Sequence, residues 1–169
     1  MITQKNQIPN LDFSKKYNAE HAAHYFTKHK KGWLRKLSNW REVKIARKAV
    51  RYIGSPQAVL DLPCGTGRFW EMLARENDKY IFACDNSADM LKHGLESRTK
   101  EICRQVCPFQ ASAFAIPLKD NAIAAIFCIR LFHHIGKVED RKILLQELAR
   151  VASDYIIISL WIDGNKKNK

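Results

Sequence analysis

The chain has 169 residues, of which 46% are hydrophobic and 27% charged, a balance typical of one globular domain. This composition excludes collagen-like, low-complexity and wholly disordered chains, and no apolar run approaches the ~18 residues that a membrane-spanning helix needs. The opening residues MITQKNQIPNLD lack the apolar centre of a secretory signal. No arginine precedes Arg35, which argues against a mitochondrial transit peptide. We therefore expect a soluble cytoplasmic protein with no transmembrane segment.

The formal net charge of +12 is concentrated near the N-terminus. Residues 1–56 contain 13 Lys and Arg against 3 Asp and Glu, whereas residues 57–169 contain 16 against 14. A basic segment attracts nucleic acid, an anionic lipid surface or an acidic partner. The same pattern is also typical of the solvated face of an amphipathic helix, so the charge alone does not identify a partner.

The five cysteines follow no recognisable disulfide or metal-binding pattern. Cys103 and Cys107 are four positions apart, wider than the commonest zinc-knuckle spacing, and no second pair completes a site. We predict reduced thiols, as in other cytosolic proteins, and no bound metal.

Two helices are predicted in the basic segment, after a polar and flexible start at residues 1–13. The first covers residues 14–30, and the second follows Gly32 and ends at Gly54. The second helix begins with apolar side chains at i, i+4 and i+7, which form one apolar stripe: Trp33, Leu37 and Trp40.

From Ala58 onward, short apolar runs alternate with helical patterns. Strands are predicted at residues 58–62, 80–85, 108–113, 122–132 and 155–161, and helices at 68–75, 87–98 and 139–151. Strands that alternate with helices of this length predict a doubly wound, mostly parallel α/β sheet. The chain then divides into a flexible N-terminus (1–13), a basic helical segment or lid (14–56), an α/β core (57–162) and a short basic tail (163–169).

A glycine-rich turn follows the first predicted strand, where Gly65 and Gly67 allow a tight turn and a close approach to a ligand. Trp70 replaces the third glycine of a dinucleotide fingerprint, and no Gly-Lys-Ser/Thr of a phosphate-binding loop is present. Asp61 and Asp85 instead end the first two strands. Carboxylates at this place repel a pyrophosphate but suit a ribose diol and a cationic amino-acid group, a description that S-adenosylmethionine fits.

Four segments carry a family resemblance: VLDLPCGTGRF, ACDNSADML, QASAFAIPL and AIFCIRLFHHI. In this order and spacing they resemble the class I S-adenosylmethionine-dependent methyltransferases, in particular the subgroup that includes ubiquinone and menaquinone C-methyltransferases. The resemblance covers roughly residues 58–162. It implies a Rossmann-like fold, S-adenosyl-L-methionine as the cofactor and S-adenosyl-L-homocysteine as the product.

The resemblance also implies where the cofactor binds. The loop after the first strand wraps the methionine part, and the end of the second strand with the helix after it holds the ribose and adenine. The segment after the third strand borders the adenine, while the end of the fourth strand and an N-terminal lid close the pocket. The implied residues of the loop are Asp61, Pro63, Cys64, Gly65, Thr66 and Gly67, and those of the second strand and the helix after it are Asp85, Asn86 and Met90. After the third strand they are Ser112, Ala113 and Phe114, and at the end of the fourth strand they are Cys128 and Arg130. In the lid they are Tyr17 and Tyr25.

Three positions depart from the family pattern. Pro63 stands at the usual first glycine of the loop, Ser112 at the usual adenine-binding aspartate, and Ala124 at the aspartate before the fourth strand. Proline removes an N–H donor from the loop, and serine is a weaker partner than aspartate for the adenine amino group. None of these changes removes the pocket on physical grounds.

Methyl transfer from a sulfonium is an in-line displacement, so the protein acts chiefly by alignment and by excluding water. A general base is needed only when the acceptor must lose a proton. His133 is the candidate base because His133 and His134 directly follow the fourth strand, at the ligand-binding end of the predicted sheet. The alternative is structural, with one histidine capping the strand and the other facing solvent. Cys64 and Cys128 are interpreted as pocket walls.

Three functions remain open. We expect first a methyltransferase that acts on a small-molecule or lipid-like acceptor; the alternatives are an RNA methyltransferase that uses the basic segment and a non-catalytic cofactor-binding scaffold. Only a short tail follows the strand at 155–161, so the usual C-terminal antiparallel strand pair is expected to be missing. The apolar edge of that strand predicts a homodimer, unless the chain is a fragment.

Overall fold

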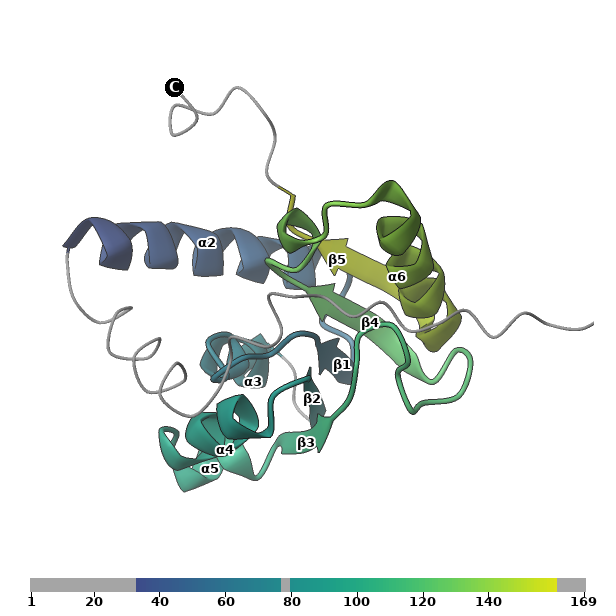
Figure 1. Cartoon of the computed structure of the whole chain (residues 1–169). Coiled ribbons are helices and arrows are strands. Elements are labelled where there is room, and N and C mark those ends of the chain that lie inside the picture. Colours follow the sequence, from purple (N-terminus) through teal and green to yellow (C-terminus); the bar gives the residue numbers. More distant parts are fainter. Residues whose placement is uncertain (1–32, 77–79, 161–169) are drawn as a thin grey trace, which may run out of the picture.

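The computed structural model describes residues 33–76 and 80–160 (Figure 1). Its centre is a five-stranded sheet in the order β3-β2-β1-β4-β5, and every pairing in it is parallel. The order turns back at β1, which has β2 on one side and β4 on the other. In open α/β sheets, ligands bind beyond the carboxyl ends of the strands at such a point. The strands are β1 (Ala58–Asp61), β2 (Tyr80–Asp85), β3 (Val106–Gln110), β4 (Ile123–Cys128) and β5 (Ala152–Ile158).

Helices cover both faces of the sheet. They are α2 (Trp33–Tyr52), α3 (Trp70–Glu76), α4 (Ala88–Glu96), α5 (Lys100–Cys103) and α6 (Val138–Val151), with the short 3₁₀ helix η2 (Phe132–His134). On one face, Val50 of α2, Trp70 of α3 and Leu91 of α4 share a buried cluster. On the other face, the buried Leu144 and Leu148 of α6 belong to a second cluster. A sheet buried on both sides explains why its central strands are almost wholly apolar.

The predicted parallel α/β fold is confirmed, and so is the burial of the fourth strand. In β4, Ile126 and Phe127 are fully buried, and the strand pairs with β1 on one side and with β5 on the other. The predicted start of the second core helix is also confirmed, because the Ser87 hydroxyl caps α4 by accepting a hydrogen bond from the Met90 N–H (3.3 Å).

The third strand begins two residues earlier than predicted and ends three residues earlier. It ends at Gln110, whereas the prediction extends to Ala113. Ser112 closes a turn instead: its hydroxyl accepts a hydrogen bond from the Phe114 N–H (3.2 Å), and its carbonyl accepts one from the Ala115 N–H (3.0 Å). Local bonds of this kind give the backbone an alternative to the sheet ladder.

The last two strands also differ from their predicted bounds. β4 ends at Cys128 rather than at residue 132, because Arg130 has a φ of +66°, which no strand residue adopts. β5 begins at Ala152, directly after α6, and ends at Ile158. The predicted strand at 155–161 therefore begins too late and ends too late.

Helix α2 confirms the predicted helix after Gly32, but the apolar stripe at its start does not face the core. Leu37 is 52% exposed and Trp40 is 59% exposed, whereas Ala46 and Val50 are buried. The N-terminal half of α2 extends past the sheet, so only the second half reaches the core (Figure 1).

Some predictions concern residues outside the described ranges, namely the flexible start at 1–13, the helix at 14–30, and the tail at 163–169. Within the described residues, β5 forms one edge of the sheet, and Tyr155 on it is 47% exposed. Pairing of this edge with a second copy of the chain stays a prediction. No helix in the described part of the chain has the length and apolarity to span a bilayer.

Candidate functional site

The loop between β1 and α3 is held close to the end of β2. The Cys64 N–H donates a hydrogen bond to the carbonyl of Cys84 (2.9 Å). Gly65 and Gly67 have φ values of +55° and +69°, in the left-handed region that favours glycine. A Cβ on Gly67 would also lie 2.4 Å from the ring of Trp70, so the indole that replaces the third glycine packs directly under the loop.

Asp85 binds this loop from the carboxyl end of β2. Its Oδ2 accepts a hydrogen bond from the Gly65 N–H (2.8 Å) and its Oδ1 accepts one from the Ser87 N–H (2.9 Å). Burial raises the pKa of the Asp85 carboxyl, and these backbone hydrogen bonds oppose the rise. Because each carboxylate oxygen has two lone pairs, both oxygens can still accept a hydrogen bond from a ligand hydroxyl.

Asp61, at the end of β1, is 1% exposed, and its Oδ2 has no hydrogen-bond partner within the described residues. Burial and the neighbouring Asp85 charge raise the pKa of Asp61 well above its usual range. The Trp70 N–H lies close enough to the carboxylate to oppose this rise, although its geometry is too poor for a regular hydrogen bond. An unsatisfied buried carboxylate is costly, so it is normally matched by a bound donor or cation.

These two carboxylates define what the site can hold. An ammonium or sulfonium group suits the carboxylate of Asp61, and a pair of adjacent hydroxyls suits the remaining lone pairs of Asp85. A phosphate is disfavoured, because like charges repel strongly where little water screens them. The donor set therefore fits the S-adenosylmethionine that the sequence predicts.

Three buried thiols line this part of the molecule: Cys64, Cys84 and Cys128. Burial and the nearby carboxylates raise the pKa of all three thiols, that of Cys84 to about 12. They stay neutral at physiological pH and are poor nucleophiles and poor metal ligands. The described residues contain no group of side chains that could hold a metal ion.

The structure brings most of the predicted cofactor residues to the ends of β1 and β2. Thr66 is buried in the loop, and the Met90 Cε lies 3.9 Å from where a Gly65 Cβ would stand. Asn86 is exposed, and its carbonyl accepts a hydrogen bond from the Gln110 side chain (2.9 Å). Of the remaining predicted residues, Pro63 lies in the loop, Ser112, Ala113 and Phe114 follow β3, Cys128 ends β4, and Tyr17 and Tyr25 are outside the described residues.

Arg130 follows β4 as predicted, but its side chain contacts α2. Its Nε donates to Oε1 of Glu42 (2.8 Å), and Oε2 of the same carboxylate pairs with Arg68, at the end of the glycine loop. Arg68 also donates to Oδ1 of Asn39 (2.5 Å). Glu42 was not among the residues predicted from the sequence, although it is the only acidic residue in α2, beside seven Lys and Arg.

His133 and His134 lie in η2, directly after β4, and their ring centroids are 4.1 Å apart. Partial burial, followed by the neighbouring His134 and Arg130, lowers the pKa of His133 to about 4, and Glu42 opposes this shift. Burial and Arg130 lower the pKa of His134 as well. Both imidazoles are therefore neutral at physiological pH, and His133 is a weak base.

Comparison with known proteins identifies the family of this chain. The family model described as a methyltransferase domain matches residues 59–154. The chain is 31% identical over 105 residues to the tRNA (carboxymethyluridine(34)-5-O)-methyltransferase ALKBH8 of Mus musculus, a match that covers 60% of this chain and 14% of that protein. It is 30% identical over 90 residues to the uncharacterized methyltransferase-like protein C25B8.10 of Schizosaccharomyces pombe, covering 53% and 33%. The chain thus matches a third or less of the length of these curated relatives.

Solved structures agree on the fold. A SAM-dependent methyltransferase from Aquifex aeolicus has a TM-score of 0.54 and 26% identity, over 67% of this chain and 62% of that chain. A protein of Methanococcus maripaludis assigned as an S-adenosyl-L-methionine-dependent methyltransferase has a TM-score of 0.67 over 99% of this chain and 70% of that chain. At 19% identity, this second likeness shows the fold alone.

Proposed function

The chain belongs to the class I S-adenosylmethionine-dependent methyltransferases, and from this premise we propose that it methylates a nucleoside of RNA. The cofactor is S-adenosyl-L-methionine, which supplies a methyl group on a positively charged sulfur. The RNA acceptor is proposed from the relatives of the chain, from its charge and from the chemistry of the site.

The observation that carries the methyltransferase function is the pair of buried carboxylates at the ends of β1 and β2, with Asp61 beside the hydrogen-bonded Asp85. Asp61 would hold the cationic amino-acid end of the cofactor, and Asp85 would orient the ribose. The buried thiols of Cys64 and Cys128 would act as apolar walls that exclude water. Alignment and water exclusion are what an in-line displacement requires from the protein.

Two observations support RNA as the acceptor. Three curated relatives, from Mus musculus, Macaca fascicularis and Xenopus tropicalis, are named as tRNA (carboxymethyluridine(34)-5-O)-methyltransferases, at 27% to 31% identity. Helix α2, which contacts the site through Glu42, carries seven cationic side chains and one acidic side chain. A helix of this charge favours a polyanion over a neutral metabolite or lipid.

The low pKa of His133 favours an acceptor that is ionised without its help. A phenol has a pKa near 10, so transferring its proton to a base of pKa about 4 is strongly unfavourable. A carboxylate on a nucleoside is already deprotonated at neutral pH and needs no base. We therefore propose an acceptor atom that needs no general base, such as a carboxylate oxygen, while a catalytic role of His133 stays a prediction.

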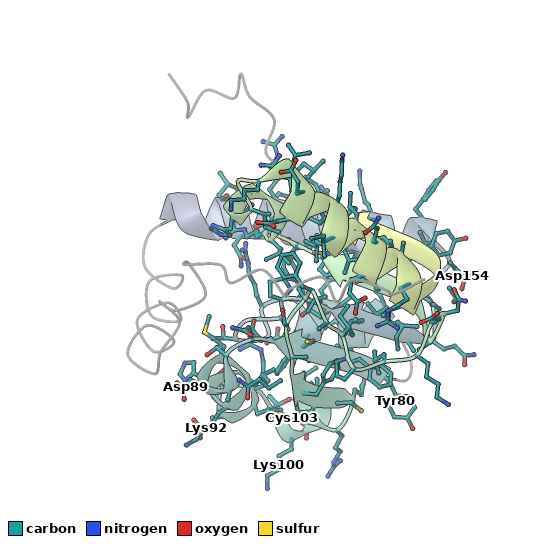
Figure 2. All side chains as sticks on the ribbon, turned by 45° about the vertical axis from the view of Figure 1, so that its right-hand side comes forward. Tyr80, Asp89, Lys92, Lys100, Cys103 and Asp154 are labelled. Carbon is teal, nitrogen blue, oxygen red and sulfur yellow. The ribbon has the colours of Figure 1, made fainter. Side chains whose placement is uncertain are left out.

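Calorimetric titration of S-adenosylmethionine into the full chain tests the cofactor site. Asp85→Ala should weaken binding roughly tenfold or more, the loss expected for hydrogen bonds to a charged group. The matched control is Asp89→Ala, because Asp89 is an exposed carboxylate in the first turn of α4, and it should bind like wild type (Figure 2). A folded wild-type protein that binds no cofactor would contradict the methyltransferase function.

Transfer of a labelled methyl group tests the acceptor. The full chain would be incubated with methyl-labelled S-adenosylmethionine and either unfractionated tRNA or a protein-free extract of small metabolites and lipids. We expect label in the RNA, released by mild alkali as a methyl ester would be. Label in the small-molecule fraction would favour the small acceptor, and no label despite cofactor binding would favour a scaffold.

A further inference from the structure

The outward face of α2 carries a line of cations without a carboxylate. Arg41, Lys44, Lys48 and Arg51 occur at i, i+3, i+7 and i+10, which places them on one stripe of the helix. All four are exposed, and only Arg51 among them forms an ion pair within the described residues, with Glu76. At a rise of 1.5 Å per residue, the stripe is about 15 Å long.

Large apolar side chains flank this line of cations. Trp40 is 59% exposed on one flank, and Ile45 and Tyr52, which are 60% and 92% exposed, lie on the other. The Lys44 Nζ lies 4.9 Å from the centroid of the Trp40 ring, a cation–π contact. A cationic track beside exposed aromatic rings is how proteins bind single-stranded nucleic acid, with phosphates on the cations and bases stacked on the rings.

The order of residues across the face favours RNA over a membrane. A helix that lies on a membrane buries a continuous apolar sector, and its cations lie at the borders of that sector or opposite it. On α2 the central exposed stripe begins with Leu37 and continues with the cations Arg41, Lys44 and Lys48. Trp40 lies at one border, and Ile45 and Tyr52 lie at the other, so the exposed apolar side chains form no continuous sector. This arrangement presents charge outward and suits a phosphate backbone.

The same helix is joined by ion pairs to the segments that follow β1 and β4. Glu42 bridges Arg68, at the end of the glycine loop, and Arg130, at the end of β4. Farther along the helix, the buried Ala46 and Val50 anchor α2 in the core. A strand held on the outward face of α2 therefore has a fixed position relative to the carboxyl ends of β1 and β4.

We propose that the face of α2 formed by Trp40, Arg41, Lys44, Lys48 and Tyr52 is the docking surface for the phosphate backbone and bases of the RNA acceptor. This inference rests on the proposed RNA methylation. It assigns acceptor binding to a surface separate from the cofactor pocket, so the two can be disabled independently.

The test compares two double variants of the full chain with the same charge change. Lys44→Gln with Lys48→Gln removes two cations from α2, whereas Lys92→Gln with Lys100→Gln removes two exposed cations from α4 and α5, at the far end of the molecule from α2 (Figure 2). Binding of fluorescently labelled unfractionated tRNA is measured by anisotropy over a range of salt concentrations. Calorimetry with S-adenosylmethionine checks that each cofactor pocket is intact.

We expect the α2 pair to weaken tRNA binding roughly five- to tenfold and to reduce the slope of log affinity against log salt by about 1.4 to 1.8, the value for two lost phosphate contacts. The control pair should change neither quantity, and cofactor affinity should stay the same in both. Trp40→Ala should weaken tRNA binding without changing the salt slope, because stacking releases no counterions.

Every other outcome contradicts the proposed docking surface, and the outcomes distinguish its failure from the failure of the proposed function. Equal weakening by both pairs would mean that only net charge matters. If wild type methylates tRNA and the α2 pair binds it normally, the docking surface is wrong but the proposed function stands. If wild type neither binds nor methylates tRNA, the proposed function fails as well. Binding to phosphatidylserine vesicles in place of tRNA would assign the face to a membrane.

Discussion

The pocket at the ends of β1 and β2 and the outward face of α2 differ in both the sign and the hydration of their charges. In the pocket, Asp61 and Asp85 are 1% and 8% exposed, and neither forms an ion pair with a described residue. On α2, Arg41, Lys44 and Lys48 are exposed and form no ion pair within the described residues. A buried pair of carboxylates selects a small ligand with a cation and hydroxyls, whereas a hydrated line of cations selects a long polyanion. The two halves of a transfer reaction thus have separate surfaces.

Gly67→Ala should lower the free energy of unfolding more than any of the variants that follow. It changes the loop of the cofactor pocket and leaves α2 unaltered. A left-handed φ costs an alanine about 1–2 kcal/mol, and moving the buried Trp70 indole away from a Cβ at 2.4 Å adds roughly 1–3 kcal/mol. The free energy of unfolding, measured with urea, should fall by about 2–5 kcal/mol.

The control for this variant is Gly136→Ala, since Gly136 has no left-handed φ and no atom within 4 Å of a new Cβ. Its free energy of unfolding should change by less than about 0.5 kcal/mol. If Gly67→Ala had wild-type stability, the glycine loop and Trp70 would have to rearrange at little cost. The pocket would then be more flexible than its close packing indicates.

Asp61→Asn should stabilise the free protein and abolish its function. Burial raises the pKa of Asp61, so the ionised carboxylate opposes folding once the pH exceeds the pKa in the unfolded chain. At neutral pH, removing this charge should raise the free energy of unfolding by roughly 1–3 kcal/mol, while calorimetry should detect much weaker binding of S-adenosylmethionine.

The pH dependence of the free energy of unfolding distinguishes the effect of the Asp61 charge from an effect of side-chain packing. Below the unfolded pKa of about 3.9, Asp61 is protonated in both states, so the stability difference between Asp61→Asn and wild type should disappear. It should be fully developed only above the raised pKa of the folded state. A difference that is constant with pH would contradict the assignment of a buried, strained charge.

Glu42→Gln tests the connection between the two regions. The variant removes the charge that Arg68 and Arg130 share, at a cost of about 1 kcal/mol in stability, because these ion pairs are partly solvated. We expect kcat for tRNA methylation to fall several-fold with unchanged affinity for S-adenosylmethionine. Glu139→Gln, at an exposed position in α6, is the control and should match wild type. A loss of cofactor affinity in Glu42→Gln would mean that α2 belongs to the pocket.

His133→Asn should have the smallest effect. A general base contributes 10²- to 10⁴-fold to a rate, but a carboxylate acceptor needs none, so kcat should fall by less than about tenfold. The profile of kcat against pH should also lack a limb assignable to an imidazole with a pKa of about 4. A loss of a hundredfold or more would restore His133 as the base and point to a different acceptor atom.

The strand pattern, the glycine loop and the two strand-ending carboxylates were predictable from the sequence, because each rests on local rules. Apolar runs identify buried strands, and a carboxylate that ends a strand of a parallel sheet lies at the ligand-binding edge. The errors arose where a side chain or a single dihedral angle ends a strand, as the Ser112 turn does after β3 and the φ of Arg130 does after β4. Neither is encoded in hydrophobic periodicity.

What the sequence determined is which residues carry the chemistry: an acid after each of two buried strands, two glycines between them, and an excess of cations near the N-terminus. What the tertiary structure decided is how their charges are used. Burial raised the pKa of Asp61, and the packing of Ala46 and Val50 with the ion pairs of Glu42 holds α2 with its line of cations outward. Burial and pairing depend on contacts between residues far apart in the chain, and local patterns do not encode those contacts.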